Sequence, residues 1–155
     1  MFRGITAINM DAKGRLVIPT RYRDVLLQTN ENQTFPCVVT IDTESPCLLL
    51  YPMSVWESIE AKLQALSSFK PASRRIQRLL LGHATELEID ANGRILLPTL
   101  LRNYAGLEKK TVLVGQGKKF EIWDESKWNA SREEWLSQGL HDGDEMTEEL
   151  ESLSL

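Results

Sequence analysis

The stretch Asp11-Ala12-Lys13-Gly14-Arg15 decides the fold, because the chain repeats it 79 residues later as Asp90-Ala91-Asn92-Gly93-Arg94. Each copy lies between two apolar runs, which is typical of a β-hairpin with a polar, glycine-bearing turn. The aspartate can accept hydrogen bonds from nearby turn amides, and the glycine can take the positive φ angle of a tight reversal. The sequence therefore predicts two equivalent hairpin turns, a first tip at residues 11–15 and a second tip at residues 90–94, each ending in an arginine.

The likeness between the two copies continues past the turn. Leu16-Val17-Ile18-Pro19-Thr20 corresponds to Ile95-Leu96-Leu97-Pro98-Thr99, and Arg23 corresponds to Arg102. In the first copy we expect a hairpin of residues 5–10 and 15–19, followed by a short helix that begins at the threonine. Because repeated units of this size usually complete each other, we expect a pseudo-two-fold axis within the chain, with strands from residues 5–19 pairing with the second half.

The rest of the chain also contains recurring sequence patterns. Apolar runs predict one further hairpin in each half, formed by residues 37–42 with 47–51 and by residues 111–114 with 120–123. Amphipathic runs predict three helices, from Trp56 to Leu66, from Pro71 to Gly82, and from Trp128 to about Leu140. Residues 30–33 are expected to form a loop and residues 141–155 a frayed or disordered acidic end. The predicted fold class is α+β, mainly β, with flanking helices.

Charge is distributed unevenly along the 155 residues. The net charge is −4, but residues 1–120 carry a net charge of +5 and residues 121–155 a net charge of −9. A basic body with an acidic tail favours a nucleic-acid partner, although acidic tails also serve solubility. No run approaches the ~18 apolar residues of a membrane span, and the first 30 residues do not resemble a signal peptide. We therefore expect a cytoplasmic protein without a membrane partner.

Catalytic chemistry has few candidates in this sequence. The two histidines, His83 and His141, are not beside a serine or cysteine that would form a nucleophile pair. The glycines at 115 and 117 lack the rest of any phosphate-binding fingerprint. The sequence predicts no enzyme, no cofactor and no small-molecule substrate.

Cys37 and Cys47 are the only cysteines, and both lie in apolar runs where a thiol is usually a small buried hydrophobe. If their strands pair around a turn near Glu44, Cys37 faces Tyr51 rather than Cys47. A disulfide is therefore not expected. A zinc site is not expected either, because further ligands at a usable spacing are lacking.

The two tips admit two interpretations. Asp11, Gly14, Asp90 and Gly93 are interpreted as turn-forming residues, and the arginines could simply pair with the aspartates. A turn needs no guanidinium, however, and a two-stranded ribbon fits a DNA major groove, where arginine contacts guanine or phosphate. The first copy adds further cations to its own tip, with Lys13 where the second copy has Asn92, so the first tip should bind anions better. The expected DNA-binding residues are Arg15, Lys13, Arg3 and Arg94, with Arg21 and Arg23 near the first tip.

The polar side of the helix expected over residues 71–82 carries Arg74, Arg75 and Arg78. These arginines are interpreted either as a solvated helix face or as a second surface for phosphate or another subunit.

Several motifs in combination resemble the MraZ family of bacterial transcriptional regulators, which have two AbrB-like domains. These motifs are Met1-Phe2-Arg3-Gly4, residues 11–23, 74–84, 90–94, 112–116 and 121–124. The resemblance implies two swapped-hairpin repeats that close into one pseudo-two-fold barrel. The corresponding boundaries are 5–52 for the first AbrB-like repeat, 53–80 for a helical connector, 81–124 for the second repeat, and 125–155 for a C-terminal helix and acidic tail.

The resemblance also implies a function. It indicates a sequence-specific, nucleoid-associated regulator of its own promoter and of the division and cell-wall gene cluster, acting as a ring-shaped homo-oligomer. A ring presents its tips head to tail, so direct repeats are expected in double-stranded DNA. The family's Asp-x-x-x-Arg motif falls on Asp11 with Arg15 and on Asp90 with Arg94, and Asn92 departs from it in charge. The alternative is an antitoxin-like module whose tips bind another protein.

Overall fold

The structure is a computed structural model that describes residues 1–28, 35–139 and 147–153. The loop predicted at residues 30–33 and the acidic stretch 141–146 lie outside these residues. The chain divides into two compact units, Met1–Glu125 and Ser126–Leu155.

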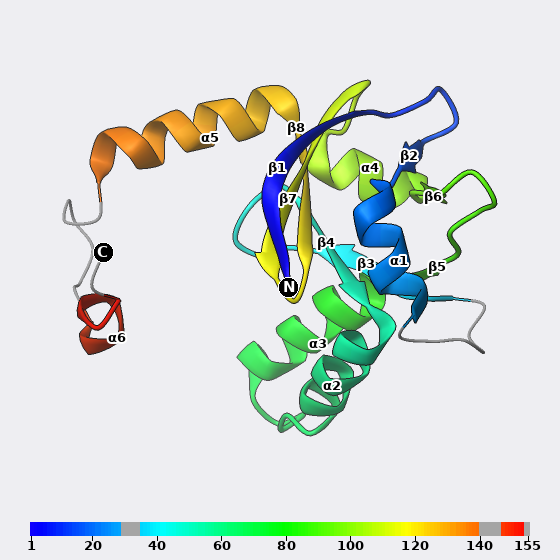
Figure 1. The fold of residues 1–155 in the computed structure, drawn as a ribbon. Helices are drawn as coiled ribbons and strands as arrows, with labels where there is room; N and C mark the ends of the chain where they lie inside the picture. Colours follow the sequence, from blue (N-terminus) through cyan, green and yellow to red (C-terminus); the bar gives the residue numbers. More distant parts are fainter. Residues whose placement is uncertain (29–34, 140–146, 154–155) are drawn as a thin grey trace. The chain divides into compact units, whose positions relative to one another are not determined.

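The strands of the first unit form two antiparallel sheets (Figure 1). The larger sheet contains, in spatial order, β1 (Phe2–Asn9), β7 (Lys110–Gly117), β8 (Phe120–Asp124), β4 (Leu48–Pro52), β3 (Cys37–Ile41) and β5 (Thr85–Leu87). The smaller sheet is a two-stranded ribbon of β2 (Arg15–Val17) and β6 (Arg94–Leu96).

The order of the strands shows the expected pseudo-two-fold relation. Exchanging the copies maps β1, β7 and β8 onto β5, β3 and β4, so the order of the larger sheet reads the same from either end. The axis passes between Leu16 and Ile95 in the ribbon, and between Leu49 and Glu121 in the sheet, because each pair joins equivalent positions. β1 pairs with β7, and β2 pairs with β6, so strands from residues 5–19 do pair with the second half.

Three expectations about the strands are not confirmed. Residues 5–10 and 15–19 do not form a paired hairpin, because the arms diverge beyond the bond from Asp11 N to Arg15 O and each finds its partner in the other copy. The expected closed barrel is not confirmed, since the described strands form two separate sheets. The fold is α+β but not mainly β, because more of the described residues lie in helices than in strands.

The β3–β4 hairpin differs by one residue from the expected register. Cys37 lies opposite Pro52, and Val38 lies opposite Tyr51, because the turn closes with Asp42 N donating to Cys47 O. Both thiols are free and buried.

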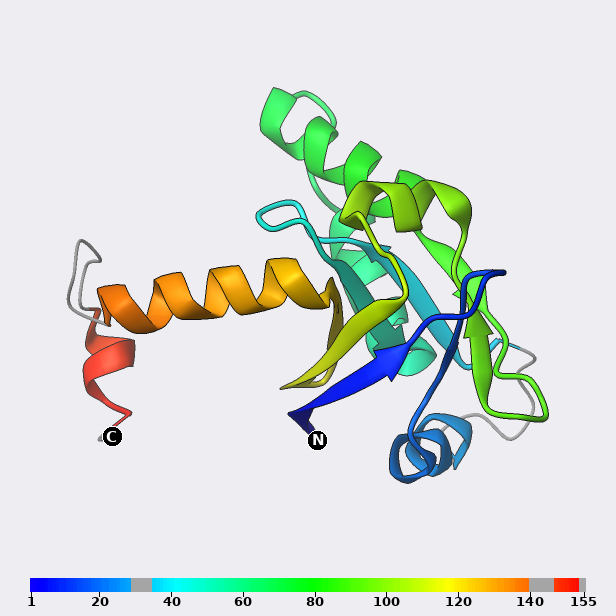
Figure 2. The ribbon, with the colours of Figure 1, turned by 90° about the horizontal axis from the view of Figure 1, so that it is seen from above.

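Helices cover the two faces of the larger sheet differently (Figures 1 and 2). On one face, α2 (Met53–Gln64) and α3 (Pro71–His83) bury Val38, Leu49, Trp56 and Leu63. The opposite face packs against the ribbon and against α1 (Thr20–Gln28) and α4 (Thr99–Ala105), in a core that includes Leu16, Ile18, Ile95 and Leu97. Strand alternation explains this division, because neighbouring residues of β3 and β4 point to opposite faces.

The helix boundaries differ slightly from those expected. α2 begins at Met53 rather than Trp56, directly after Pro52, and α3 continues through Gly82 to His83, so Gly82 does not end that helix. The first residue of α5 (Glu125–Gln138) belongs to the first unit, and the second unit contains the other residues of α5 together with α6 (Glu148–Glu151). The Thr147 hydroxyl accepts a hydrogen bond from Leu150 N at the start of α6. Among the described residues, the helices are too short or too polar to cross a membrane.

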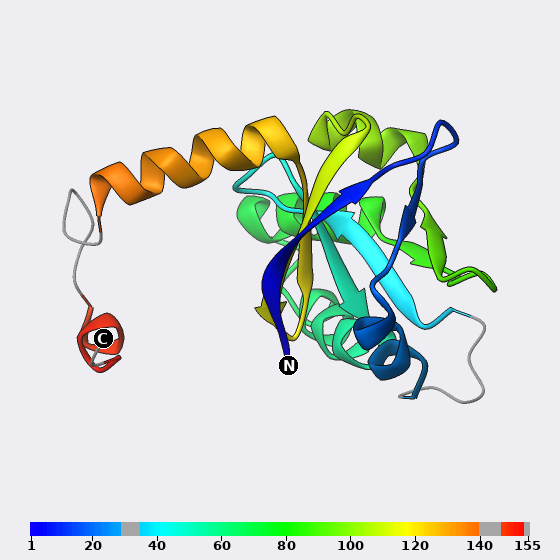
Figure 3. The same cartoon turned by 45° about the horizontal axis from the view of Figure 1, so that its top comes forward.

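Each tip leads directly into one strand of the ribbon (Figure 3) and makes a backbone hydrogen bond to the opposite copy. Gly14 O accepts a hydrogen bond of 3.0 Å from Leu97 N, and Gly93 O accepts one of 2.9 Å from Ile18 N. Both glycines have positive φ angles, 88° at Gly14 and 75° at Gly93. A side chain at Gly14 would come within 2.6 Å of the Arg102 guanidinium carbon, so Arg102 would have to shift.

We therefore predict that Gly14→Ala lowers the free energy of unfolding by about 1–3 kcal/mol, mainly through the strained φ angle. The matched control is Gly82→Ala in α3, where a Cβ meets nothing within 4 Å. Alanine in a helix should stabilise by roughly 0.5–1 kcal/mol relative to glycine. Urea unfolding of the two variants measures both effects. Equal unfolding midpoints would contradict the requirement for glycine at the tip.

Candidate nucleic-acid interface

The carboxylate of each tip organises its turn. Asp11 Oδ1 accepts hydrogen bonds of 2.9 Å from the amides of Lys13 and Arg15, and Gly14 N donates to Asp11 O at 3.0 Å. In the second copy, Asp90 Oδ1 accepts from the amides of residues 92 and 94, also at 2.9 Å. The two turns therefore have the same backbone geometry, although their side chains differ in charge.

These hydrogen bonds favour the ionised form of each aspartate. The pKa of Asp11 is lowered from 3.8 to about 2, chiefly by the amide of Arg15 and further by the Arg15 side chain and the Lys13 amide. The pKa of Asp90 is lowered in the same way, chiefly by the amide of Arg94. Both carboxylates are thus negatively charged at neutral pH, and each can hold a cation.

Each aspartate holds its arginine by one nitrogen only. Arg15 Nε donates to Asp11 Oδ2 at 2.6 Å, and Arg94 Nε donates to Asp90 Oδ2 at 2.8 Å. Within the described part of the chain, the terminal Nη nitrogens of these arginines make no hydrogen bond or ion pair. The carboxylate therefore fixes the direction of the guanidinium and leaves its two-nitrogen edge available for a ligand.

Both arginines lie on one face of the ribbon. Arg15 is opposite Leu96, and Arg94 is opposite Val17, while Leu16 and Ile95 between them are buried on the other face. Val17 and Leu96 are 44% and 55% exposed. Diagonal neighbours in such a pair lie roughly 7–8 Å apart, so this outer face, formed by Arg15, Val17, Arg94 and Leu96, presents two guanidinium groups close together.

The swap of the hairpins exchanges a further pair of arginines. Arg102 of α4 lies over Gly14 of the first tip, and Arg23 of α1 lies over Gly93 of the second tip. Arg23 is therefore placed at the second tip, contrary to the expectation that it joins the first, because α1 follows a strand that pairs with the other copy. Arg23 Nε donates to Ile18 O at 2.8 Å, whereas the buried Arg102 Nε has no partner among the described residues.

Two other groups of expected cations lie elsewhere. Arg3 is near the start of β1, opposite Gln116, at the end of the strand away from the first tip. The structure therefore does not bring Arg3 to Lys13 and Arg15. The arginines of α3 belong to the helix that packs on the sheet face opposite the ribbon. They cannot join the outer face of the ribbon in one continuous surface.

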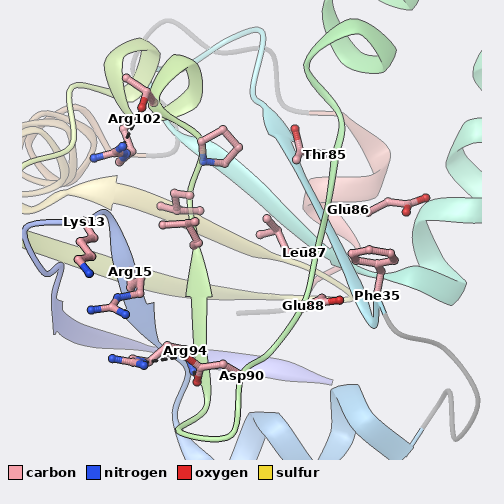
Figure 4. A pocket seen from close by; sticks show the side chains of 14 residues that line it. Lys13, Arg15, Phe35, Thr85, Glu86, Leu87, Glu88, Asp90, Arg94 and Arg102 are labelled. Atoms are coloured by element: carbon pink, nitrogen blue, oxygen red, sulfur yellow. Dashed lines mark hydrogen bonds and ion pairs between the residues drawn. The ribbon is translucent and has the colours of Figure 1, made fainter.

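A groove of about 750 Å³ runs beside the outer face of the ribbon (Figure 4). Four cations line it on the side of the tips, namely Lys13, Arg15, Arg94 and Arg102. The segment at and after β5 supplies an acidic side with Glu86 and Glu88, and Phe35 is among the other residues that line the groove. The groove thus has walls of opposite charge, and only the wall towards the tips attracts an anion.

This fold and site define a class of protein in which two swapped-hairpin repeats build one cationic ribbon. The chain matches the family model "MraZ protein, putative antitoxin-like" over residues 1–79 and 80–149. It is 57% identical over 155 residues to the transcriptional regulator MraZ of Legionella pneumophila (strain Corby), covering all of both chains. It is 56% identical to the protein of that name from Coxiella burnetii (strain Dugway 5J108-111), again over all of both chains. The protein belongs to the MraZ family.

We predict that Asp11→Asn removes a pH-dependent contribution to stability. Because the pKa of Asp11 is lowered in the folded state, that contribution is present above about pH 4 and is lost as the pH falls towards 2. Asp11→Asn should therefore be less stable than the unmodified protein at pH 6, and the difference should shrink between about pH 5 and pH 2. Urea unfolding across this range measures it, with Asp24→Asn in α1 as the control. A difference that is constant with pH would contradict the assignment.

Proposed function

We propose that this chain is a transcriptional regulator that binds double-stranded DNA through the outer face of its ribbon and the adjoining tips. The observation that carries the proposal is the pair of arginines, each held by an aspartate at Nε while its Nη nitrogens make no hydrogen bond or ion pair among the described residues. A turn could be closed without a guanidinium, so this arrangement is better explained by recognition. The names of the relatives support it, since each is a transcriptional regulator.

The residues of the interface have different roles in binding DNA. Arg15 and Arg94 have the geometry to contact guanine O6 and N7 or a pair of phosphate oxygens. Lys13 is exposed and acts as a point charge towards phosphate. Val17 and Leu96 can pack against thymine methyl groups. Glu86 and Glu88 repel phosphate on the other side of the groove, so the DNA backbone lies towards the tips.

The two tips should contribute unequally. The first tip combines Lys13 and Arg15 with Arg102 from α4, whereas the second combines Arg94 with Arg23 from α1. The second tip therefore has one cation fewer, because Asn92 replaces the lysine. We expect the first tip to dominate the affinity and the second to adjust the orientation of the ribbon on DNA.

A single chain offers too few contacts for a specific site. Specific protein–DNA interfaces bury on the order of 1,000 Å² or more, which one ribbon does not provide. A ring-shaped homo-oligomer resolves this shortfall by presenting successive tips to direct repeats. We place these repeats upstream of the protein's own gene and its division and cell-wall cluster, which makes the protein cytoplasmic and nucleoid-associated.

A second candidate is an antitoxin-like module that binds another protein through the same surface. The exposed Val17 and Leu96 favour it, because aliphatic side chains between arginines suit a protein interface as well as a DNA groove. The family description also contains the term antitoxin-like. Binding to an acidic protein together with equal, weak affinity for every DNA sequence would favour this candidate.

We predict that Arg15→Ala weakens binding to the upstream DNA by about 1–3 kcal/mol and reduces sequence preference, because a base contact is lost. Lys13→Ala should weaken binding to all sequences alike and reduce the slope of log affinity against log salt by about one. Arg75→Ala on α3 is the matched control and should bind as the unmodified protein does. Gel-shift titrations at two salt concentrations measure all three.

Two outcomes of that experiment would decide against the proposal. If folded Arg15→Ala and Lys13→Ala bind the upstream DNA like the unmodified protein, the tips are not the DNA site. If Arg75→Ala is the variant that loses affinity, the arginine face of α3 is the DNA-binding surface instead.

We predict that two or three direct repeats in phase bind at least about tenfold more tightly than one repeat, because each contact after the first is intramolecular. Tips can enter the same face of B-DNA only if the repeats are ~10 bp apart or a multiple of that spacing. Adding ~5 bp between two repeats should remove most of the gain. Titration against probes with one, two, three and half-turn-shifted repeats tests this. Equal affinity for all four probes would mean that each tip acts alone.

A further inference from the structure

A cluster of three ionisable side chains lies at the end of the β3–β4 hairpin, against β8. Asp42 directly follows β3, Cys47 directly precedes β4, and Glu121 is in β8. Cys47 is fully buried, and Glu121 is only 9% exposed. Cys47 Sγ is 3.6 Å from Asp42 Oδ2 and 3.8 Å from Glu121 Oε2, and one ligand atom from each residue lies within 4.8 Å of the others. We call these three residues the thiol cluster.

The thiol cluster contains more hydrogen-bond acceptors than donors. Glu121 Oε1 already accepts from Gln116 Nε2 at 3.0 Å and from Trp123 Nε1 at 3.2 Å, so Oε2 is the oxygen aimed at the sulfur. The thiol has one hydrogen for two carboxylate oxygens. When it donates to Asp42, the nearer carboxylate, Glu121 Oε2 is a buried acceptor without a donor among the described residues. Such an atom is costly to bury unless a proton or a cation accompanies it.

The negative charge of the two carboxylates also favours a bound cation. Among the described residues, Asp42 and Glu121 form no ion pair with a lysine or arginine, so no such side chain neutralises the thiol cluster there. Two carboxylates beside a buried thiol form surroundings that attract a cation to which a thiolate can bind.

We propose that Asp42, Cys47 and Glu121 bind one divalent transition-metal ion of the zinc class. With Zn–S near 2.3 Å and Zn–O near 2.1 Å, a tetrahedral site separates sulfur from oxygen by about 3.6 Å. The two sulfur–oxygen distances in the cluster are 3.6 and 3.8 Å. One thiolate with two carboxylates suits zinc or cobalt better than magnesium or calcium, which prefer oxygen alone. Binding forms the metal–sulfur bond and releases the thiol proton to solvent.

Neighbouring groups already orient these ligands. Gln116 and Trp123 hold Glu121 through Oε1, and the amide of Glu44 donates to Asp42 Oδ1 at 3.1 Å. Each carboxylate therefore presents its other oxygen to the sulfur, as expected of groups that fix a metal ligand. The three protein ligands leave a fourth position for water.

The ligands come from both halves of the chain. Asp42 and Cys47 lie in the first matched segment, residues 1–79, and Glu121 lies in the second, residues 80–149. The metal ion therefore joins the β3–β4 hairpin to β8 across the repeat boundary. None of the three residues belongs to the ribbon or lines its groove, so this site goes beyond the proposed DNA-binding function. We expected no zinc site because we looked for ligands at short spacings along the chain. Glu121 is 74 residues from Cys47, so the spacing does not indicate it as a ligand.

The test uses the full untagged chain, first stripped of metal by a chelator and then titrated with Co²⁺ or Zn²⁺. We expect one ion per chain, a sulfur-to-cobalt absorption band, and a Tm increase of about 5 °C or more at saturation. Cys47→Ala should lose the band and weaken binding by more than the roughly 10–100-fold that loss of an outer partner costs. The matched control is Cys37→Ala, whose buried thiol donates to Leu87 O and faces no carboxylate, and it should bind like the unmodified chain.

Glu121→Gln provides a second variant that keeps the volume of the side chain. It should retain the absorption band but bind the ion at least about tenfold more weakly, and so it tests the proposal even if Cys47→Ala does not fold. Failure of the unmodified chain to bind Co²⁺ or Zn²⁺ at micromolar concentration would overturn the proposal. So would a Cys47→Ala variant that keeps the absorption band. Neither readout involves DNA, so failure here leaves the proposed function standing.

Discussion

The hydrogen bonds that tie each turn to the opposite copy are the constraint on which the rest of this structure depends. Gly14 O accepts from Leu97 N, and Gly93 O accepts from Ile18 N. These two bonds extend the short ribbon beyond its three paired residues on each strand. They also bring the helix after each ribbon strand to the other copy's turn, which is why Arg102 covers Gly14. Neither copy can complete its own tip.

The same carboxylate that closes a turn also aims its arginine, so the structural and functional interpretations of the tip do not compete. Asp11 uses Oδ1 for two turn amides and Oδ2 for Arg15 Nε. The guanidinium is thereby held in one direction before any ligand arrives, and less side-chain entropy is lost on binding. A lysine in place of Arg15 could pair with Asp11 but would have no second edge left to present.

The sequence predicted what is local or repeated, and it failed where distant strands decide the outcome. The Asp-x-x-Gly-Arg repeat was enough to predict both turns and the pseudo-two-fold relation, because turn chemistry and periodicity are visible in a few residues. It could not show that Arg23 belongs to the second tip, since that depends on which strand β2 pairs with. The β3–β4 register was wrong by one residue because it depends on how Asp42 and Cys47 close the turn.

Divergence between the copies shows which positions symmetry constrains and which it leaves free. At the axis within the ribbon, Leu16 and Ile95 are both aliphatic and fully packed, because each must fill the same space from opposite sides. At the axis within the larger sheet, Leu49 faces Glu121, so the second copy places a carboxylate where the first has an aliphatic side chain. A buried carboxylate needs hydrogen-bond donors, and Gln116 and Trp123 of the same copy supply two of them to Oε1 of Glu121. Oε2 of Glu121 is directed at Cys47 of the first copy's hairpin. Leu49 has no carboxylate to direct at the second copy's hairpin. This contact between a carboxylate and the opposite hairpin can therefore occur only once in each chain.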